Sequence, residues 1–367
     1  MKSGSSAIGL AAALVALSPA GAGANEGGVT MFVRGDTDQT TVVSPRAAVG
    51  VGLDEERTRF DIAYTADVWT SASIDIRTAA TAPVTEQRDQ IDAAASHQID
   101  DVSIGASYYF SGEADYWSHG VSLLSAQELL AKSTTLEERV TWSHDTVGRS
   151  GDSDFARPLD TGSLRLGLTQ ILSPQLIVQG IWEGSYRVGF QSSPYRFVGL
   201  GGDGQCGGTA VLCVPEAHPD TRLRNAFVLR GRHSLSPGSS LGLGYRLYFD
   251  DWGVTAHTAT AQVAWLPSES STITLRYRFH LQSAAAFYRS TYPIPAGQLR
   301  YATRDRELSS MFSNRIALSY ETKVVLADDV SLGLAFALGG TAFVYGDFVG
   351  LDEVFAGDAT VAITLEL

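Results

Sequence analysis

The sequence lacks the features of a helical membrane protein and of a nucleic-acid-binding protein. After an apolar run at residues 7–17 it has no stretch of about 18 consecutive apolar residues, the length that a membrane-spanning helix needs. Its 27 basic side chains are outnumbered by 40 acidic ones, which gives a formal net charge of −13. A helical transporter is therefore excluded, and we expect no nucleic acid among the partners.

Motifs for metals and cofactors are also missing. The 7 histidines stand singly, and no H-E-x-x-H or H-x-H pattern places two imidazoles on one metal. Serines are frequent, but the sequence does not say which of them would meet an acid–base partner across a sheet. We expect no metal site, no cofactor and no catalytic residue, so an enzyme is the last of the functions considered.

The chain has only two cysteines, Cys206 and Cys213, and both lie in the segment GLGGDGQCGGTAVLCVPEAHPD. Their spacing is not C-x-x-C and His218 is the only histidine nearby, so a metal or redox centre is poorly supported. In an exported protein, two cysteines that close a small loop predict a disulfide.

The N-terminus predicts export. Lys2 precedes the apolar run, and Ser18 and Pro19 are followed by small residues up to a cleavage site after Ala24. We therefore expect residues 1–24 to be a signal peptide and residues 25–367 to form a single exported domain.

What the sequence does have is alternation of polar and apolar residues. In RTRFDIAYTADVWTSASIDIR, residues 57–77, charged and hydroxyl side chains occupy odd positions and large apolar ones even positions. The same period of two recurs in QLIVQGIWEGSYRV, LGLGYRLYFD and TITLRYRFHL. This period is that of β-strands with one apolar face, and near-zero mean hydropathy suits a sheet whose polar positions match its apolar ones.

The connections between these segments alternate between short and long. Asp250 to Gly253 is an exception among the long ones, a tight turn expected to place Trp252 at the lipid interface. An up-and-down barrel has its tight turns on one rim and its loops on the other. Tight turns are expected near residues 54–55, 100–101, 132–133, 173–174, 236–238 and 267–268, and long connections at 146–160, 191–221 and 283–307.

The predicted fold class is all-β: a transmembrane up-and-down antiparallel β-barrel of about sixteen strands, within limits of about 12 and 18. A soluble β-sandwich is disfavoured because it would not segregate its loops in this way. The strands are expected at residues 28–34, 42–53, 57–78, 84–98, 101–111, 118–130, 134–146, 160–172, 175–190, 222–235, 239–251, 254–266, 270–283, 310–322, 329–345 and 355–367.

The segment 57–77 is longer than one membrane crossing requires. At about 3.4 Å per residue and a tilt near 40° it rises about 50 Å, roughly twice the apolar band of such a barrel. We expect the part up to about Trp69 to cross, and the rest to project as a hairpin with residues 84–94. Gln87 and Asp89 support this, because they would be costly on a lipid-facing surface.

If the apolar faces contact lipid, the polar faces line a lumen. Cross-strand ladders of arginine and carboxylate would brace a wide wall, whereas an unpaired lining would select solutes, and both roles stay open for any single residue. The strands near 222–232 and 276–278 carry arginines with almost no acidic residues. This locally basic wall indicates that the solutes are anions. The candidate lumen-lining residues are Arg57, Arg59, Asp61, Asp67, Glu137, Arg139, Arg165, Glu183, Arg187, Arg222, Arg224, Arg230, Arg232, Arg246, Arg276 and Arg278.

Several segments together resemble a known family. They are YYFSGEADYWSHG (108–120), SSPYRFV (192–198), PDTRLRNA (219–226), YRLYFDDWGVTAHT (245–258), LRYRFHLQSAAAFY (275–288) and RDREL (304–308). Over residues 42–322 the chain is similar to domain-of-unknown-function family 3570, a set of Gram-negative proteins regarded as outer-membrane barrels. The resemblance implies a barrel in the outer membrane of a Gram-negative bacterium, and no activity, substrate or catalytic residue.

The leading function is a porin-like channel or transporter for small solutes, anionic ones among them. The alternative is a non-conducting structural or interaction barrel, its lumen plugged by the loop near 191–221 or 283–307. A barrel enzyme ranks third. The expected partners are outer-membrane lipid, a small solute and the barrel-assembly machinery, although the chain ends on Leu367 and not on the aromatic residue that this machinery often reads.

Overall fold

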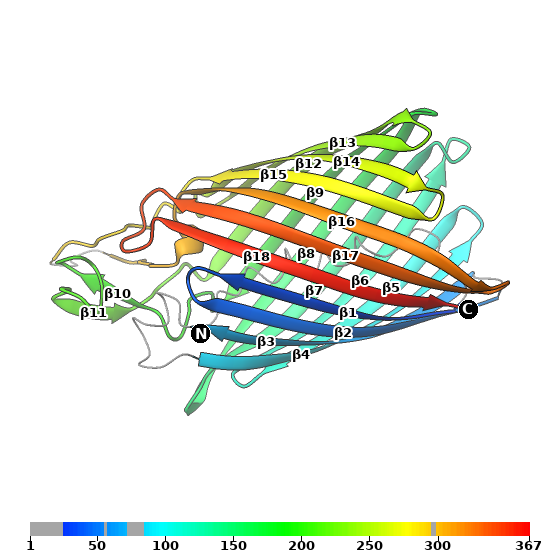
Figure 1. Ribbon diagram of the computed structural model, residues 1–367. Helices are drawn as coiled ribbons and strands as arrows, with labels where there is room; N and C mark the ends of the chain where they lie inside the picture. The colour runs from blue at the N-terminus through cyan, green and yellow to red at the C-terminus, as the bar shows by residue number, and fades with distance from the viewer. Residues whose placement is uncertain (1–24, 55–56, 72–83, 295–298) are drawn as a thin grey trace.

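The computed structural model describes residues 25–54, 57–71, 84–294 and 299–367, so the predicted signal peptide lies outside the described residues. The wall is a closed barrel of antiparallel strands in the order β1-β18-β17-β16-β15-β14-β13-β12-β9-β8-β7-β6-β5-β4-β3-β2 (Figure 1). The prediction of an all-β barrel with sixteen strands is confirmed. The strands are β1 (Asn25–Asp36), β2 (Thr40–Leu53), β3 (Thr58–Ser71), β4 (Val84–Ile99), β5 (Val102–Glu113), β6 (Tyr116–Leu129), β7 (Thr134–Arg149), β8 (Asp152–Ser173), β9 (Leu176–Gly189), β12 (Thr221–Ser236), β13 (Ser239–Asp250), β14 (Thr255–Ser268), β15 (Ser271–Gln282), β16 (Met311–Ala327), β17 (Val330–Tyr345) and β18 (Glu353–Glu366).

The first and last strands close the barrel. β1 pairs with β18 from Glu26 opposite Glu366 to Asp36 opposite Ala356. Along the rest of the wall each strand pairs with its neighbours in sequence, except that β9 pairs with β12. The strands between them, β10 (Phe197–Leu200) and β11 (Leu212–Pro215), form a separate hairpin inside the connection predicted at 191–221.

The two ends of the barrel carry different connections. The last residue lies at one end, which we call the terminal end, where the Leu367 N–H donates to the Asn25 carbonyl at 2.9 Å. The hairpin β10–β11 and the loop between β15 and β16 lie at the opposite end, the loop end (Figure 1). Among the described residues no helix is long and apolar enough to cross a membrane, and the one named helical turn is η1 (Arg306–Leu308).

The long connection predicted at residues 146–160 is wrong. β7 runs on to Arg149 and β8 starts at Asp152, so a tight turn with Gly151 at φ +80° joins two extended strands. The ring of Phe155 explains part of this, because the guanidinium of Arg149 lies 4.9 Å from its centroid and Phe190 meets it edge-on at 5.5 Å. These contacts hold as a hairpin a segment whose glycine, serine and aspartate content predicted a loop.

β3 covers only part of the long alternating segment. It ends at Ser71, and the projecting part predicted beyond it lies in 72–83, outside the described residues. Gln87 and Asp89 do lie on the outer surface, but they are not left unsatisfied. Asp89 accepts hydrogen bonds from the Tyr64 hydroxyl at 2.5 Å and from the Gln87 amide at 3.0 Å, which lowers the cost of exposing both on this face.

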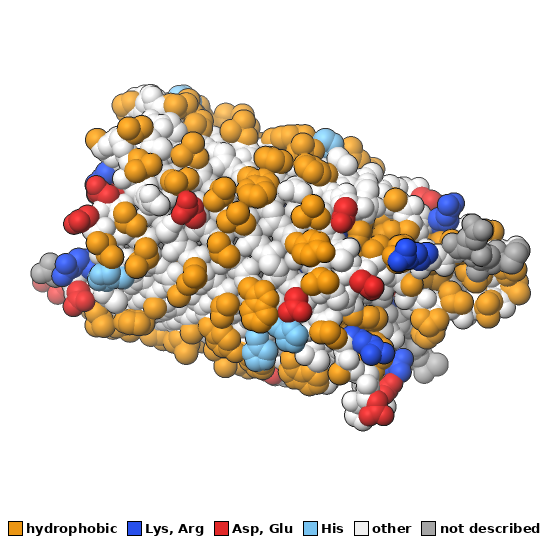
Figure 2. Space-filling view, turned by 180° about the vertical axis from the view of Figure 1, so that it is seen from behind, with side chains coloured by type: hydrophobic (Ala, Val, Ile, Leu, Met, Phe, Trp, Pro, Cys, Tyr) orange, Lys and Arg blue, Asp and Glu red, His pale blue; other side chains and the backbone are white. Residues whose placement is uncertain are grey.

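The outer surface of the wall is apolar. Large side chains such as Leu123, Leu229 and Leu338 are 65–67% exposed, and Figure 2 shows hydrophobic side chains spread over the whole visible face with few charges among them. Contiguous apolar surface of this extent requires an apolar environment around it. Lipid around a barrel satisfies that requirement, because the closed sheet leaves no backbone edge exposed.

One polar pattern repeats around this outer surface. The seventh residue of each of five strands is a tyrosine or tryptophan whose polar group bonds to a side chain on the next strand, two residues nearer the loop end than its directly opposite partner. Each bond satisfies a polar group that would be costly beside lipid. The pairs are Tyr64–Asp89, Tyr108–His119, Trp182–Asn225, Tyr245–His257 and Tyr277–Asn314, at 2.5 to 3.3 Å.

Candidate functional site: the lumen and its cap

Side-chain alternation assigns one face of each strand to the lumen. On β12, Leu223, Phe227 and Leu229 are exposed outward, so the arginines at the even positions point inward. Of the candidate lumen-lining residues, all except Arg57 lie on wall strands, on the face opposite the outward apolar side chains. Arg57 lies in the turn before β3, where its Nε donates to the Asp54 carbonyl at 3.2 Å.

The lumenal faces of β1–β4 and β16–β18 form what we call the paired side. Here most basic groups bond to carboxylates on the same or a nearby strand, and the exception is Arg34 on β1, whose guanidinium lies 5.7 Å from the centroid of the Phe343 ring. Arg88, for example, lies opposite Asp67 in the register and donates to it through Nε at 2.9 Å. The ion pairs are Arg59 with Glu26 and Asp61, Arg88 with Asp67, Arg46 with Asp92, Arg315 with Asp358, and Lys323 with Glu366.

The lumenal faces of β7–β9 and β12–β15 form the arginine side. Glu183 there is shared between Arg165 at 3.6 Å and Arg246 at 3.4 Å. Other arginines bond to neutral groups, as Arg230 does to Gln179 at 2.7 Å. Among the described residues no carboxylate lies within ion-pair distance of Arg139, Arg187, Arg224, Arg230, Arg232, Arg276 and Arg278.

A folded cap stands at the loop end. It consists of residues 190–220 and the described part of 283–310, and it lies beyond the ends of the wall strands rather than between them (Figure 1). Short bridges join its two halves, Ala217 to Ala302 and Leu200 to Tyr292. Two small apolar cores are buried here, which is unusual for surface connections. Their buried residues are Val198, Leu200, Tyr292 and Ala302 in one, and Trp252, Val254, Ala285, Tyr288, Leu308 and Phe348 in the other.

The turn sequence predicted Trp252 at the lipid interface, and this prediction is wrong. Trp252 is 4% exposed, and its ring meets His218 at 5.2 Å and Phe287 at 5.2 Å, both from the cap. Its indole N–H donates to the Thr221 carbonyl at 2.8 Å. A tryptophan in a tight rim turn suits either lipid or a covering loop, and only the fold decides between them.

A buried polar network joins the two halves of the cap around Glu216. This carboxylate accepts from Arg196 at 3.2 Å and from the Thr303 hydroxyl at 2.7 Å, and it lies 3.2 Å from His218. Burial raises the pKa of Glu216, but Arg196, His218 and Thr303 outweigh that effect and lower the pKa to about 2. The network therefore holds a charged carboxylate at neutral pH.

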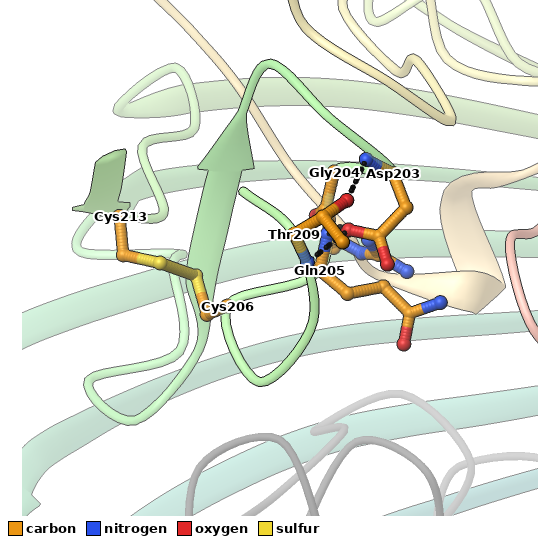
Figure 3. The surroundings of a disulfide bond; sticks show 7 residues. Asp203, Gly204, Gln205, Cys206, Thr209 and Cys213 are labelled. Atoms are coloured by element: carbon orange, nitrogen blue, oxygen red, sulfur yellow. Dashed lines mark hydrogen bonds between the residues drawn. A yellow bond between two sulfur atoms is a disulfide. The ribbon is translucent and has the colours of Figure 1, made fainter. Parts of the chain in front are cut away.

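The predicted disulfide between Cys206 and Cys213 is confirmed (Figure 3). It closes a loop whose other restraint is Asp203, which accepts the backbone N–H groups of Gln205 and Thr209 at 3.0 Å each. These hydrogen bonds lower the pKa of Asp203. Bridge and turn together fix the tip of the cap.

Sequence reasoning missed the cap as a folded unit, although a signal was present. Two of the segments that carry the family resemblance, SSPYRFV at 192–198 and RDREL at 304–308, supply Arg196 and the residues after Thr303. Gly238, Ser240 and Gly242 also match the G-x-S-x-G spacing of serine hydrolases. Gly238 lies in the β12–β13 turn and Ser240 and Gly242 lie on β13, so the match lacks the strand-to-helix elbow of those enzymes.

The closed apolar-surfaced wall and charged lumen define a class, the outer-membrane type of β-barrel with sixteen strands. Residues 158–337 match the family described as "Protein of unknown function (DUF3570)". No curated protein matches the sequence.

Solved structures share the fold at low identity. A bacterial polysaccharide outer membrane secretin is 8% identical, with 95% of this chain and 99% of that chain covered and a TM-score of 0.56. A loop-deletion mutant of the Vibrio cholerae outer membrane protein OmpT is 8% identical (93% and 98% covered, TM-score 0.42). The CymD monoaromatic hydrocarbon channel is 10% identical (94% and 88% covered, TM-score 0.41).

Proposed function

We propose that the protein is a pore in the outer membrane of a Gram-negative bacterium and that it favours small anionic solutes. The observation that carries this proposal is the arginine side, where seven guanidinium groups face the lumen with no carboxylate within ion-pair distance among the described residues. A barrel with sixteen strands is wide enough to hold water, and a lining of one sign favours ions of the other. Export by the N-terminal signal and insertion by the barrel-assembly machinery belong to the same proposal.

Ion current through planar bilayers tests this proposal. Under a salt gradient, the reversal potential should show a preference for anions. Replacing Arg276 and Arg278 by Ser should lower the anion-to-cation permeability ratio severalfold, because two uncompensated charges leave the lumen. As a matched control, replacing both Arg315 and Asp358 by Ser removes a neutral pair and should leave the ratio unchanged. Well-folded protein that gives no current, or a ratio unmoved by the arginine changes, would contradict the proposal.

A second candidate is favoured by the cap. Its arms bond to separate points of the rim: Arg306 to Asp38 at 2.5 Å in the β1–β2 turn, and Tyr195 to Asp115 between β5 and β6. A cap held at such points suits a non-conducting barrel that presents a rigid surface to a partner. Absence of current from protein with an intact cap supports this candidate over the pore.

A further inference from the structure

Three arginines meet on the lumenal face next to the loop end. The register of β9 and β12 places Arg187 opposite Arg222, and Arg224 opposite Ser185. Since residues two apart on a strand share a face, all three guanidinium groups start from the same small area of wall. Like charges at directly opposed positions destabilise a sheet unless something compensates them.

Of the three arginines, Arg222 alone has a carboxylate within ion-pair distance among the described residues. Arg222 donates to Asp250 through Nε at 2.9 Å and Nη2 at 2.6 Å, and its guanidinium lies 4.2 Å from the centroid of the Trp252 ring. Arg224 donates to a neutral group, the Ser185 hydroxyl, at 3.1 Å. The Nε of Arg187 is buried and has no hydrogen-bond acceptor among the described residues.

The acidic groups that face this area are already engaged. Asp145 on β7 accepts the hydroxyls of Tyr116 and Ser118, each at 2.5 Å, and lies beyond ion-pair distance of Arg187. Asp250 accepts the Tyr248 hydroxyl at 2.7 Å in addition to Arg222. Three positive groups therefore face two negative ones, and Arg187 and Arg224 share one positive charge in excess.

We propose that Arg187 and Arg224 form a binding site for a small oxyanion, a phosphate or carboxylate group, at the loop end of the lumen. Guanidinium groups bind such anions with two parallel N–H donors each, and an oxygen ligand would satisfy the buried Nε of Arg187. The site lies directly beneath the cap, because Trp252 contacts both Arg222 and the cap residue His218. This proposal rests on the proposed anion pore and gives the anion a resting place at its entry.

Calorimetric titration of the full-length barrel in detergent tests the site without requiring conduction. Inorganic phosphate, acetate and chloride are titrated separately at matched ionic strength. Phosphate or acetate should bind saturably and chloride should bind much more weakly, because a guanidinium can donate two parallel N–H bonds to two oxygens of an oxyanion but not to a single atom. The tighter of the two oxyanions identifies the ligand group.

Single substitutions assign the binding to these residues. Arg187→Gln and Arg224→Gln should each weaken oxyanion binding about tenfold or more, and Arg187→Lys should fall between them and the wild type. Arg88→Gln makes the same change in net charge on the paired side and should stay within about twofold. Folding of every variant is checked by its heat-modifiable mobility on detergent gels.

The outcomes separate this site from the pore. The protein could bind an oxyanion saturably, lose that binding on the Arg187 and Arg224 changes, and yet carry no current. This result would support the binding site and contradict the pore. Current without saturable oxyanion binding shows that water alone occupies the site and overturns it. If the wild type and both glutamine variants bind the oxyanion with equal affinity, the anion binds elsewhere, and the proposed site is overturned as well.

Discussion

The paired side and the arginine side of the lumen both carry arginines, but the two sides differ in how many of these arginines have a carboxylate partner. On the paired side three arginines reach carboxylates two strands away: Arg46 crosses β3 to Asp92, Arg59 crosses β2 to Glu26, and Arg315 crosses β17 to Asp358. Glycines make the last two reaches sterically feasible, because a Cβ at Gly50 or Gly339 would lie within 2.3 Å of the crossing guanidinium. On the arginine side Arg246 makes such a reach across β12 to Glu183, but among the described residues no carboxylate lies within ion-pair distance of Arg276 or Arg278.

This difference separates bracing from lining. A guanidinium that bonds to a carboxylate two strands away ties three strands together, and its charge is cancelled for a passing solute. A guanidinium without such a partner adds no brace and keeps its field in the lumen. The same residue type therefore serves the wall on one side and, by our proposal, the solute on the other.

The largest expected effect concerns the cap, which contacts the paired side through Arg306 and Asp38 and the arginine side through His218 and Trp252. The pKa of Glu216 falls from an ordinary value of 4.5 to about 2 in the folded cap. A lowered pKa means stability that is complete above about pH 4.5 and lost as the pH falls through about 2, up to about 3 kcal/mol. Pepsin digestion followed by mass spectrometry should cut the cap at pH 2 and spare it at pH 4.

The control for this prediction removes the charge. Glu216→Gln should let pepsin cut the cap at both pH values, while the wall strands stay resistant. A wild-type cap that resists equally at pH 2 and pH 4 would show that Glu216 does not hold it.

Breaking a pair should cost the wall more than removing a lining charge. Asp358→Asn leaves Arg315 with a neutral partner, and a hydrogen bond to a charged group contributes about 1.5–3 kcal/mol. Gly339→Ala should act in the same direction, because the new Cβ displaces the guanidinium. Urea unfolding in micelles measures the free energy of unfolding of both variants. Arg278→Gln is the comparison, and it should change this free energy by less than about 0.5 kcal/mol. Equal losses for all three variants would remove the distinction between the two sides.

The reverse change should turn a lining arginine into a bracing one. Gln262 accepts from the Nε of Arg276 at 3.3 Å, so Gln262→Glu supplies a carboxylate of nearly the same shape. We expect a gain of about 0.5–1 kcal/mol in the free energy of unfolding and a smaller anion preference in the same bilayer assay. Thr272→Glu, on the lumenal face of β15 nearer the terminal end, adds the same charge as a control. If it lowers the anion preference as much without raising stability, net charge and not pairing controls selectivity.

The fold was largely predictable from the sequence, because a period of two with one apolar face is a local property. The strands predicted at 175–190 and 270–283 differ from β9 and β15 by a residue at each end. The extension of β7 and β8 was not predictable, because Phe155 contacts Phe190, a residue far along the chain. The composition of this segment predicted a loop, whereas tertiary contacts stabilise it as a strand.

The division of the lumen could be predicted only in part. Runs of arginine on β12 and β15 signalled a basic wall, but whether an arginine is paired depends on strands that lie far away in sequence. Arg315 and Asp358 are 43 residues apart, and the sequence around either residue does not identify the other as its partner. Arg187 and Arg222 become opposite neighbours only because β10 and β11 leave the wall. Register and barrel closure, not residue type, decide which charges remain.

The smallest expected effect is the salt dependence of selectivity. The Debye length falls from about 10 Å at 0.1 M salt to about 3 Å at 1 M, which screens the field of exposed arginines such as Arg230 and Arg276. Direct ion pairs such as Arg88 with Asp67 are screened less, because no ion fits between their atoms. At a constant concentration ratio, the anion preference should therefore shrink with rising mean salt while the urea midpoint moves little. A preference that persists at 1 M would mean that selectivity arises from a bound site such as Arg187 and Arg224 and not from the open arginine side.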